Sequence, residues 1–327
     1  MKKRGIGFAC SAQGVNYHFG HEDVSKVQLL VDSDNVLRIR TAASDIGQGL
    51  EAILINIVSV ALNGFPPEKI RWEGSNTTSP EAGGTGASRQ TTLTGNALHQ
   101  ACEHLKSLIR SIAAEHFDCP PDSIEIHGEN VLSKDKIIPL SEIFLQARDL
   151  GMSLEVTGSF KAPMTTALSE DGRGFLPVNQ FGYAAHIVEL EVDTTTGEVT
   201  ILTVKAFHDA GTILNPIGAA GQVEGACVMG MGFALCEEYV LAEGKPVNVG
   251  FTNYLIPSLA DTPNIQINFL SIPSPIGDLG VKGLAEAPTA TIVPAIANAI
   301  FNAIGARVTH LPATPDRVLS AIKEAQE

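Results

Sequence analysis

The segment from Gly277 to Pro288 reads Gly-Asp-Leu-Gly-Val-Lys-Gly-Leu-Ala-Glu-Ala-Pro and leads into an apolar run that ends near Gly305. Its glycines permit backbone geometries and close approaches that other residues forbid. Proline is common in the first turn of a helix, so the segment predicts a loop that enters a helix directly after Glu286.

The carboxylate of Glu286 has two interpretations at this junction of loop and helix. It could act as a general base toward a ligand that the glycine backbone allows to approach. It could instead only complement the positive end of the helix dipole. The segment alone favours the helix-dipole interpretation, and the motifs in the rest of the chain reverse that preference.

The composition describes a folded, acidic protein. The chain has 327 residues, 44% of them hydrophobic and 18% charged, which suffices for a packed core and suggests about two domains. The 36 acidic residues outnumber the 22 basic ones, which disfavours a nucleic-acid partner but leaves room for a local phosphate pocket. Neither a signal peptide nor an apolar run of roughly 20 residues is visible, so we expect no membrane association and a cytoplasmic location.

The five cysteines lie at positions 10, 102, 119, 227 and 236, without the spacing of a zinc or iron–sulfur site. Their odd number in a chain of this size argues against a disulfide framework and favours a reducing compartment. We therefore expect these side chains to behave as small buried hydrophobes.

Patterns of apolar residues divide the chain into two mixed regions and predict an α+β fold. Antiparallel hairpins are predicted around residues 32–35, 128–129 and 194–197, and helices over 50–62, 91–115, 141–150, 218–235 and 315–325. Further strands are predicted at 6–10, 70–74, 153–160, 237–241 and 265–272, with a loop at 13–20. The polar segment 162–174 is the best boundary, which gives domains of residues 1–160 and 175–327.

Two glycine-containing loops each precede a predicted helix in the first region. The loop Asp45–Gly49 has a glutamine between two glycines, and it could present that amide and its backbone N–H groups to a ligand. The loop Gly83–Gln90 combines hydroxyl groups with Arg89 and could form an anion cradle at a helix N-terminus. A capped turn and an ordinary surface loop are the alternatives, and neither loop matches a nucleotide-binding fingerprint.

The predicted helix at 218–235 contains glycines at 221, 225, 230 and 232. Glycine costs about 1 kcal/mol relative to alanine inside a helix, so several glycines indicate tight packing against backbone or against a ligand. Gln222 and Glu224 are the polar residues of this apolar helix.

Four separated motifs then fall into one order along the chain. They are Asp45–Gly49; Gly86–Gln90 with Thr94–Asn96; Asp209–Gly211 with Asn215, Pro216 and Gln222–Gly225; and Gly280–Pro288. Their order and spacing resemble the C-terminal half of the molybdenum-binding subunit of the xanthine dehydrogenase/aldehyde oxidase family, and Leu311–Leu319 resembles the family's end. The resemblance extends over nearly the whole chain. It implies two mixed α/β subdomains with antiparallel hairpins, both of which bind molybdopterin.

The resemblance also implies roles for individual residues. Glu286 would be the catalytic glutamate, Gln48 would lie near the pyranopterin, and Gln222 would lie beside the molybdenum centre. The other cofactor-binding residues implied in this way are Gly47, Gly49, Gly86, Ala87, Ser88, Arg89, Thr94, Asn96 and Gly283. The chain departs from the family at Ala285, where glycine is common, and alanine would be costly if the backbone there needs a positive φ.

For a cofactor, the resemblance implies molybdopterin cytosine dinucleotide whose molybdenum has a terminal sulfido or selenido ligand. The pterin dithiolene would hold the metal, so no protein side chain would. Electrons would leave through iron–sulfur clusters and FAD on partner subunits, because no motif here binds either group. We expect no segment equivalent to the N-terminal half of the family's molybdenum subunit, which indicates a large molybdopterin-binding partner beside an iron–sulfur subunit and an FAD subunit.

This division resembles that of nicotinate dehydrogenases, whose molybdenum subunit is carried on a large and a medium chain. It implies hydroxylation of an N-heteroaromatic substrate with water as the oxygen source, active only within the complex. Nicotinate, converted to 6-hydroxynicotinate, is the substrate we expect. A purine or xanthine hydroxylase and a non-catalytic scaffold half are the alternatives. Tyr17, in the loop at 13–18, could line the substrate pocket or belong to an ordinary surface loop.

Overall fold

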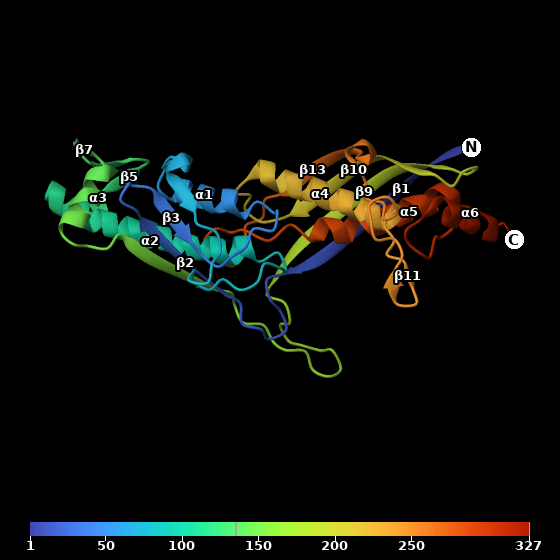
Figure 1. Ribbon diagram of the computed structural model, residues 1–327, viewed down its shortest axis with the longest axis horizontal. Helices are drawn as coiled ribbons and strands as arrows, with labels where there is room; N and C mark the ends of the chain where they lie inside the picture. Colours follow the sequence, from blue (N-terminus) through green and yellow to red (C-terminus); the bar gives the residue numbers. More distant parts are fainter. Residues whose placement is uncertain (135, 327) are drawn as a thin grey trace.

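Two separate hydrophobic cores organise the computed structural model, which describes residues 1–134 and 136–326. The first core consists of buried side chains between Val27 and Leu154, and the second of those between Val188 and Val318. The cores follow one another along the long axis of the molecule, and both chain ends lie beyond the second core (Figure 1). Each core combines a sheet with the helices that pack on it.

The first core forms where α2 (Gln90–Phe117) packs on a four-stranded sheet and α1 (Leu50–Ala61) packs on α2. The sheet has the order β4-β3-β2-β8, with β3 and β4 parallel and the other pairs antiparallel. Its strands are β2 (Val24–Val31), β3 (Leu37–Arg40), β4 (Ile70–Trp72) and β8 (Glu155–Lys161). Alternate residues of β2 are buried, because successive side chains of a strand point to opposite faces.

A small antiparallel sheet with its own helix completes the first half. Its elements are β5 (Glu125–His127), β6 (Asn130–Ser133), β7 (Lys136–Pro139) and α3 (Leu140–Asp149), and 3-10 helices span Pro67–Lys69 and Pro121–Ser123. The predicted hairpins around 32–35 and 128–129 are confirmed, and so are the predicted helices at 50–62, 91–115 and 141–150.

The second core forms between a sheet of order β1-β9-β10-β13 and the helices α4 (Pro216–Leu235) and α5 (Ala287–Ile304). Two glycines of β1 let α5 approach closely, because a Cβ at Gly5 or Gly7 would overlap a backbone carbonyl oxygen of that helix. The strands are β1 (Lys2–Val15), β9 (Gln180–Asp193), β10 (Val199–Asp209) and β13 (Asn264–Leu270). The remaining elements are β11 (Leu241–Ala242), β12 (Lys245–Pro246), a 3-10 helix at Leu259–Asp261, and α6 (Pro315–Glu324).

Strand β1 corrects two predictions. The sequence predicted a strand at 6–10 and a loop from residue 13, whereas β1 continues to Val15. It pairs antiparallel with β9, with Lys2 opposite Asp193 and Val15 opposite Gln180, so its residues join the sheet of the second half rather than a domain of residues 1–160. Local periodicity carries no information about a partner so distant in the chain.

The predicted strand at 237–241 is wrong as well. The backbone N–H of Glu237 donates to the carbonyl oxygen of Gly232 at 2.7 Å, so this residue finishes α4 instead of starting a strand. Its carboxylate accepts a hydrogen bond of 3.0 Å from the hydroxyl of Tyr254. Strand pairing begins at Leu241, in the two-residue ladder of β11 with β12.

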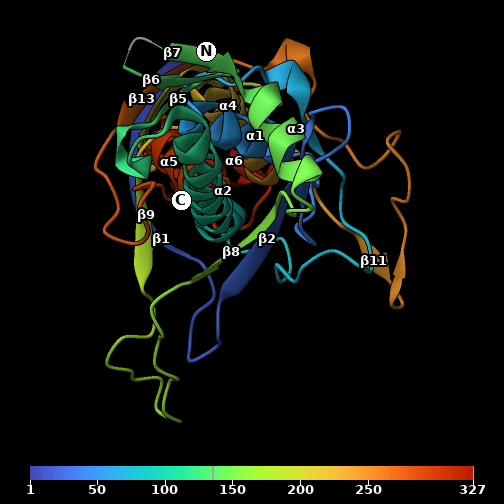
Figure 2. The ribbon, with the colours of Figure 1, turned by 90° about the vertical axis from the view of Figure 1, so that its left-hand side faces the viewer.

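Helix α5 is long and apolar enough to cross a bilayer, and it is the one such helix within residues 1–134 and 136–326. Half of it is buried, and it packs on β1 and β9 in the second core. Figure 2, which looks along the long axis, shows α5 among the other helices of the molecule. These properties fit the core helix of a packed domain.

Two histidines are buried where β9 and β10 face the second core. His186 and His208 are 0% and 1% exposed, and their Nε2 atoms are 2.9 Å apart, so one ring donates to the other. Burial lowers the pKa of His186 to about 3, with a further contribution from His208, and lowers the pKa of His208 to about 4. Both rings are therefore neutral in the folded protein at ordinary pH.

This pair predicts a loss of stability in mild acid. An unfolded histidine takes up a proton near pH 6.5, whereas these two resist it when folded, so the free energy of unfolding falls as the pH drops from 6.5 toward 4. Between pH 6.5 and 5 we expect a loss of about 2 kcal/mol per histidine. Urea unfolding at both pH values measures it. A double His186→Leu/His208→Leu variant should lose less over this interval than the wild type, while His21→Leu, at an exposed site, should behave like the wild type. An equal loss in all three proteins contradicts the prediction.

Candidate active site

The glycine-rich loop 277–286 lies against the first turns of α2. The backbone N–H of Leu279 donates to Oδ1 of Asn96 at 3.1 Å, and Nδ2 of Asn96 donates to the carbonyl oxygen of Thr92 at 2.7 Å. Gly277 has a φ of +76°, and a Cβ there would overlap the Asn96 side chain. Asn96 is only 3% exposed. Its amide therefore holds the loop, and its predicted part in cofactor binding stays a prediction.

The same loop also joins the end of β10. Gly211 forms an antiparallel bridge with Val281, and the backbone N–H of Lys282 donates to the carbonyl oxygen of Ala210 at 3.1 Å. Gly283 is pressed against the loop that precedes α2, because a Cβ there would overlap the carbonyl oxygen of Ser88. The second, third and fourth sequence motifs therefore meet at this loop, between the two cores.

Lys282 and Asp209 form a nearly buried ion pair that the sequence did not single out. Their Nζ and Oδ2 atoms are 2.6 Å apart, and the side chains are 10% and 7% exposed. The Lys282 Nζ also lies 5.8 Å from the centroid of the Tyr183 ring. Both charged residues stood inside the quoted motifs, yet spacing alone did not show that they would pair.

Gln180, which the sequence analysis also missed, ties this region together from the start of β9. Its Nε2 donates to Oγ of Ser274 at 2.6 Å and to the carbonyl oxygen of Val281 at 3.2 Å. Its Oε1 accepts from Nδ2 of Asn16 at 3.2 Å and from Oγ1 of Thr92 at 3.4 Å. With four partners and only 5% exposure, Gln180 fixes the relative positions of segments from both halves of the chain.

Glu286 lies at the point where this loop enters α5, as predicted. It occupies the N-cap position with a φ of −94°, its side chain is exposed, and that side chain makes no capping hydrogen bond. Ala285 is not among the described residues with a positive φ, so its departure from the common glycine requires no unusual backbone geometry.

Gln222 lies at the same end of the helix pair α4–α5 as Glu286. Oγ1 of Thr289 donates to the carbonyl oxygen of Ala226 at 3.1 Å, and one turn further along both helices Gly230 faces Ile292. The two helices therefore run in the same direction. Gln222 lies one turn before Ala226 on α4, and Glu286 lies one turn before Thr289 on α5. Gly221 and Gly225 on α4 have open space where a Cβ would lie, so a ligand can approach the backbone beside Gln222.

The loop that contains Gln48 is held by hydrogen bonds among its own residues. Oδ1 of Asp45 accepts from the N–H groups of Gly47 at 2.9 Å and Gly49 at 3.2 Å. Burial raises the pKa of Asp45, but these backbone hydrogen bonds outweigh it and the net pKa is lowered. Gln48 accepts from the N–H of Ile46 at 2.7 Å and donates to the carbonyl oxygen of Ser44 at 3.1 Å. One of its two amide hydrogens is left for a ligand.

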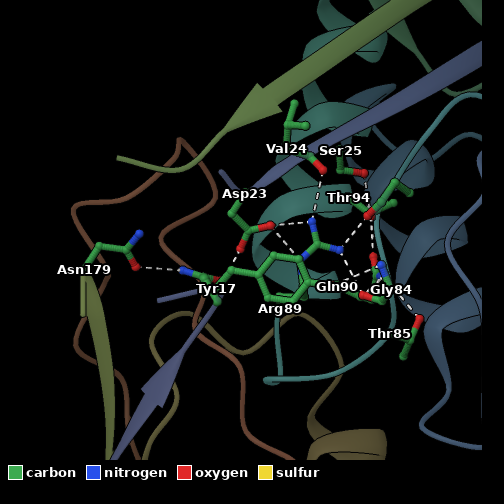
Figure 3. A network of polar contacts seen from close by, with 12 residues as sticks. Tyr17, Asp23, Val24, Ser25, Gly84, Thr85, Arg89, Gln90, Thr94 and Asn179 are labelled. Carbon is green, nitrogen blue, oxygen red and sulfur yellow. Dashed lines mark hydrogen bonds and ion pairs between the residues drawn. The ribbon is translucent and has the colours of Figure 1, made fainter. Parts of the chain in front are cut away.

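Arg89, predicted to bind the cofactor, is the centre of a buried network of polar contacts (Figure 3). Its side chain is 0% exposed and pairs with Asp23 at 2.5 Å. The same guanidinium donates to the carbonyl oxygens of Ala82, Gly84 and Val24. With its donors occupied by protein acceptors, the Arg89 guanidinium shapes the loop, and its predicted role in cofactor binding stays a prediction.

Tyr17 and Thr94 belong to the same network. The Tyr17 ring lies 4.7 Å from Cζ of Arg89, and its hydroxyl accepts from the N–H of Gly84 at 3.1 Å. The Thr94 hydroxyl bonds to Gln90 at 2.5 Å and to Ser25 at 2.8 Å, and it is 0% exposed (Figure 3). Protein groups therefore contact both side chains, and the predicted roles of Tyr17 in the substrate pocket and of Thr94 in cofactor binding stay predictions.

Ser88 differs from these neighbours. Its Oγ is buried and has no hydrogen-bond partner within residues 1–134 and 136–326. Ala87 and Ser88 both have positive φ, at 52° and 49°, so the loop turns sharply after Gly86. An unpaired buried hydroxyl costs free energy unless something else binds it. Ser88 is thus the side chain of this loop that is best suited to a ligand.

The fold and these loops define a cofactor-binding domain. The chain belongs to the molybdopterin cofactor-binding domain family, with a match over residues 1–263. The loop that bears Glu286 lies beyond that range, but sequence relatives in the xanthine dehydrogenase/aldehyde oxidoreductase family extend over 98% of the chain.

Among these relatives is the gamma subunit of the 6-hydroxypseudooxynicotine dehydrogenase complex of Paenarthrobacter nicotinovorans, 32% identical over 86% of this chain and 35% of its own length. A putative xanthine dehydrogenase molybdenum-binding subunit of Escherichia coli K12 is 30% identical over 97% of this chain and 42% of its own. The chain thus spans between a third and a half of the length of these relatives.

The solved structure of the Desulfovibrio gigas aldehyde oxidoreductase is similar, with a TM-score of 0.81 and 27% identity over 98% of this chain and 33% of its own. A Cu,Mo-containing CO dehydrogenase, at 22% identity and a TM-score of 0.84 over 99% of this chain and 42% of its own, shares the fold. These matches confirm the predicted mixed α/β fold.

Proposed function

We propose that this chain forms one half of the molybdenum-binding unit of a hydroxylating oxidoreductase, with Glu286 as its general base. The observation that carries the proposal is the arrangement of Gln222 and Glu286. Both lie at the same end of the packed helices α4 and α5, beside a loop that contacts both halves of the chain. An exposed carboxylate beside helix surface that a ligand can reach is suited to proton transfer.

The residues around this junction fit a pterin cofactor. Ser88 offers a buried hydroxyl without a partner, Gln48 offers one amide hydrogen, and the glycines flanking Gln222 leave the helix backbone open. The Gln222 side chain is partly exposed, so a ligand can reach its amide. Gly47, Gly49, Gly86 and Ala87 would contribute backbone, while Gly283 lets two loops approach.

In this proposal the bound group is molybdopterin cytosine dinucleotide, with a sulfido or selenido ligand on molybdenum. When bound, it supplies the redox chemistry of the hydroxylation, with water as the oxygen source. Glu286 accepts a proton at a carboxylate oxygen, and Gln222 orients groups next to it by hydrogen bonding. Iron–sulfur clusters and FAD on partner subunits carry the electrons away, so the chain is active only in a complex.

Nicotinate, converted to 6-hydroxynicotinate, is the substrate we propose. The relative named for 6-hydroxypseudooxynicotine and those named for xanthine support a small-molecule oxidoreductase and keep a purine hydroxylase as the second candidate. The test is turnover of nicotinate, hypoxanthine, xanthine and an aldehyde by the purified native complex, with products identified by mass spectrometry. Gain of one oxygen by nicotinate alone supports the proposal, whereas turnover of xanthine or the aldehyde alone refutes it.

A non-catalytic scaffold half is the remaining alternative. Metal and nucleotide analysis of the same complex, together with variants of this chain, separates the two possibilities. A catalytic half predicts molybdenum and cytosine nucleotide in the complex and loss of turnover when Glu286 changes. A scaffold predicts turnover that does not respond to Glu286.

A further inference from the structure

The hydrogen bonds that fix the loop bearing Glu286 end at Lys282. The carbonyl oxygen of Gly280 accepts from the N–H of Thr212 at 2.9 Å, and the backbone N–H and the side chain of Lys282 both have partners. Residues 283–285, by contrast, make no hydrogen bond within the parts of the chain that the structure describes. The next hydrogen bond belongs to α5 and reaches the carbonyl oxygen of Glu286 at 3.3 Å. Lys282 is therefore the last polar attachment before the candidate base.

The side-chain partner of Lys282 is the carboxylate of Asp209, at the end of β10. Its Oδ2 lies 2.6 Å from the Lys282 Nζ, and its Oδ1 accepts from the backbone N–H of Gly211 at 3.2 Å. Gly211 forms the antiparallel bridge with Val281, next to Lys282. One carboxylate thus holds both the lysine of the loop and the turn against which the loop pairs. Because the two charged side chains are only 10% and 7% exposed, solvent screens their attraction little.

The Lys282 side chain reaches the sheet of the second core, while the following residue packs against the first half of the chain. Tyr183 lies opposite Asp209 in the ladder, so both side chains project from the same face of the sheet, and the Lys282 Nζ is 5.8 Å from the centroid of the Tyr183 ring. Gly283 lies against Ser88, with no room for a Cβ. The loop is therefore held from two sides immediately before it enters α5.

Glu286 depends on this backbone for its position. Its side chain is exposed and makes no capping hydrogen bond, so no contact of its own carboxylate fixes it. A general base acts only within hydrogen-bond reach of the proton that it removes. A displacement of about 1 Å at a catalytic group can lower the rate about 10²-fold, even when the substituted residue lies outside the reacting groups.

We propose that Lys282 and Asp209 are positioning residues for Glu286, and that their ion pair sets where its carboxylate lies. The inference rests on the proposed function, in which Glu286 is the general base. The competing interpretation is a pair that only stabilises the fold. The two differ in what happens when both charges are removed together, because stability then recovers whereas the attachment of the loop to the sheet does not.

The test measures kcat, KM, thermal midpoint and molybdenum content of the native complex, with whichever of nicotinate, hypoxanthine, xanthine and the aldehyde the wild type oxidises. Lys282→Met should lower kcat about 10- to 100-fold at wild-type molybdenum content, with KM within about twofold. It should also lower the thermal midpoint, because Asp209 is left as a nearly buried charge without a partner. The double variant Lys282→Met/Asp209→Asn, which can still accept from Gly211, should regain the midpoint but not kcat. Lys106→Met, whose 17% exposed side chain pairs with Glu103 on α2, is the control and should keep kcat.

A second comparison places Lys282→Met in a Glu286→Gln background. There it should lower turnover by less than about twofold more, since the group that Lys282 positions no longer accepts a proton. Recovery of kcat together with the midpoint in the double variant, or full multiplication of the two losses, would overturn the inference and leave the proposed function intact. Wild-type turnover of Glu286→Gln alone would refute the proposed function, and the inference with it.

Discussion

Replacing Glu286 with glutamine is expected to lower turnover about 10²- to 10⁴-fold in the native complex, the usual contribution of a general base. The amide keeps the size of the side chain but cannot accept the proton. Glu286 is exposed and makes no capping hydrogen bond, so the change removes no packing or cap from α5. The thermal midpoint and the molybdenum content should therefore stay at wild-type values while turnover falls.

The matched control is Glu142→Gln. Glu142 is likewise an exposed carboxylate in the first turn of a helix, α3, at the other end of the molecule. A carboxylate that only complements a helix dipole contributes about 0.3–1 kcal/mol, to stability and not to turnover. Near-wild-type turnover of Glu286→Gln, or an equal loss in both variants, would return Glu286 to the helix-dipole interpretation.

Local elements of this fold were predictable because their signals are local. Helix α1 ends at the predicted Asn-Gly stop, and α5 begins where Pro288 indicated. Strand β1 was truncated in the prediction, because its length depends on pairing with β9, which begins at Gln180. The predicted strand at 237–241 failed because a side-chain partner, Tyr254, and a helix end decide that segment, and no residue pattern encodes either.

In the candidate site, too, some features could be predicted from the sequence and others could not. The resemblance implied that the motifs share one cofactor site, and the structure brings the 83–90 loop, the end of β10 and the 277–286 loop into contact. The sequence does not indicate which way a side chain points. It therefore did not show that Arg89, Thr94 and Asn96, which were predicted to bind the cofactor, pair with other groups of the protein. The sequence did not indicate that Asp23 would be the ion-pair partner of Arg89, because Asp23 lies outside every motif.

Replacing Arg89 with methionine is expected to lower the free energy of unfolding by about 3–5 kcal/mol, the usual cost of removing one partner of a buried ion pair. Asp23 would be left as an unpaired carboxylate at 2% exposure, and three carbonyl oxygens would lose a donor. Urea unfolding of the isolated chain measures this. Molybdenum content of the complex should fall as well, because Arg89 shapes the loop that presents Ser88.

The double variant Arg89→Met/Asp23→Asn should recover part of that loss. Asparagine removes the stranded charge yet keeps an oxygen that can accept from the N–H of Tyr17, which now bonds to Asp23 at 2.7 Å. Arg4→Met is the control, because Arg4 is 69% exposed and its ion pair with Glu189 spans 3.4 Å. Exposed pairs contribute about 0–1 kcal/mol, so this variant should be near neutral. If Arg89→Met costs no more than Arg4→Met, the loop is held by something other than this network, and Arg89 becomes available again as a cofactor ligand.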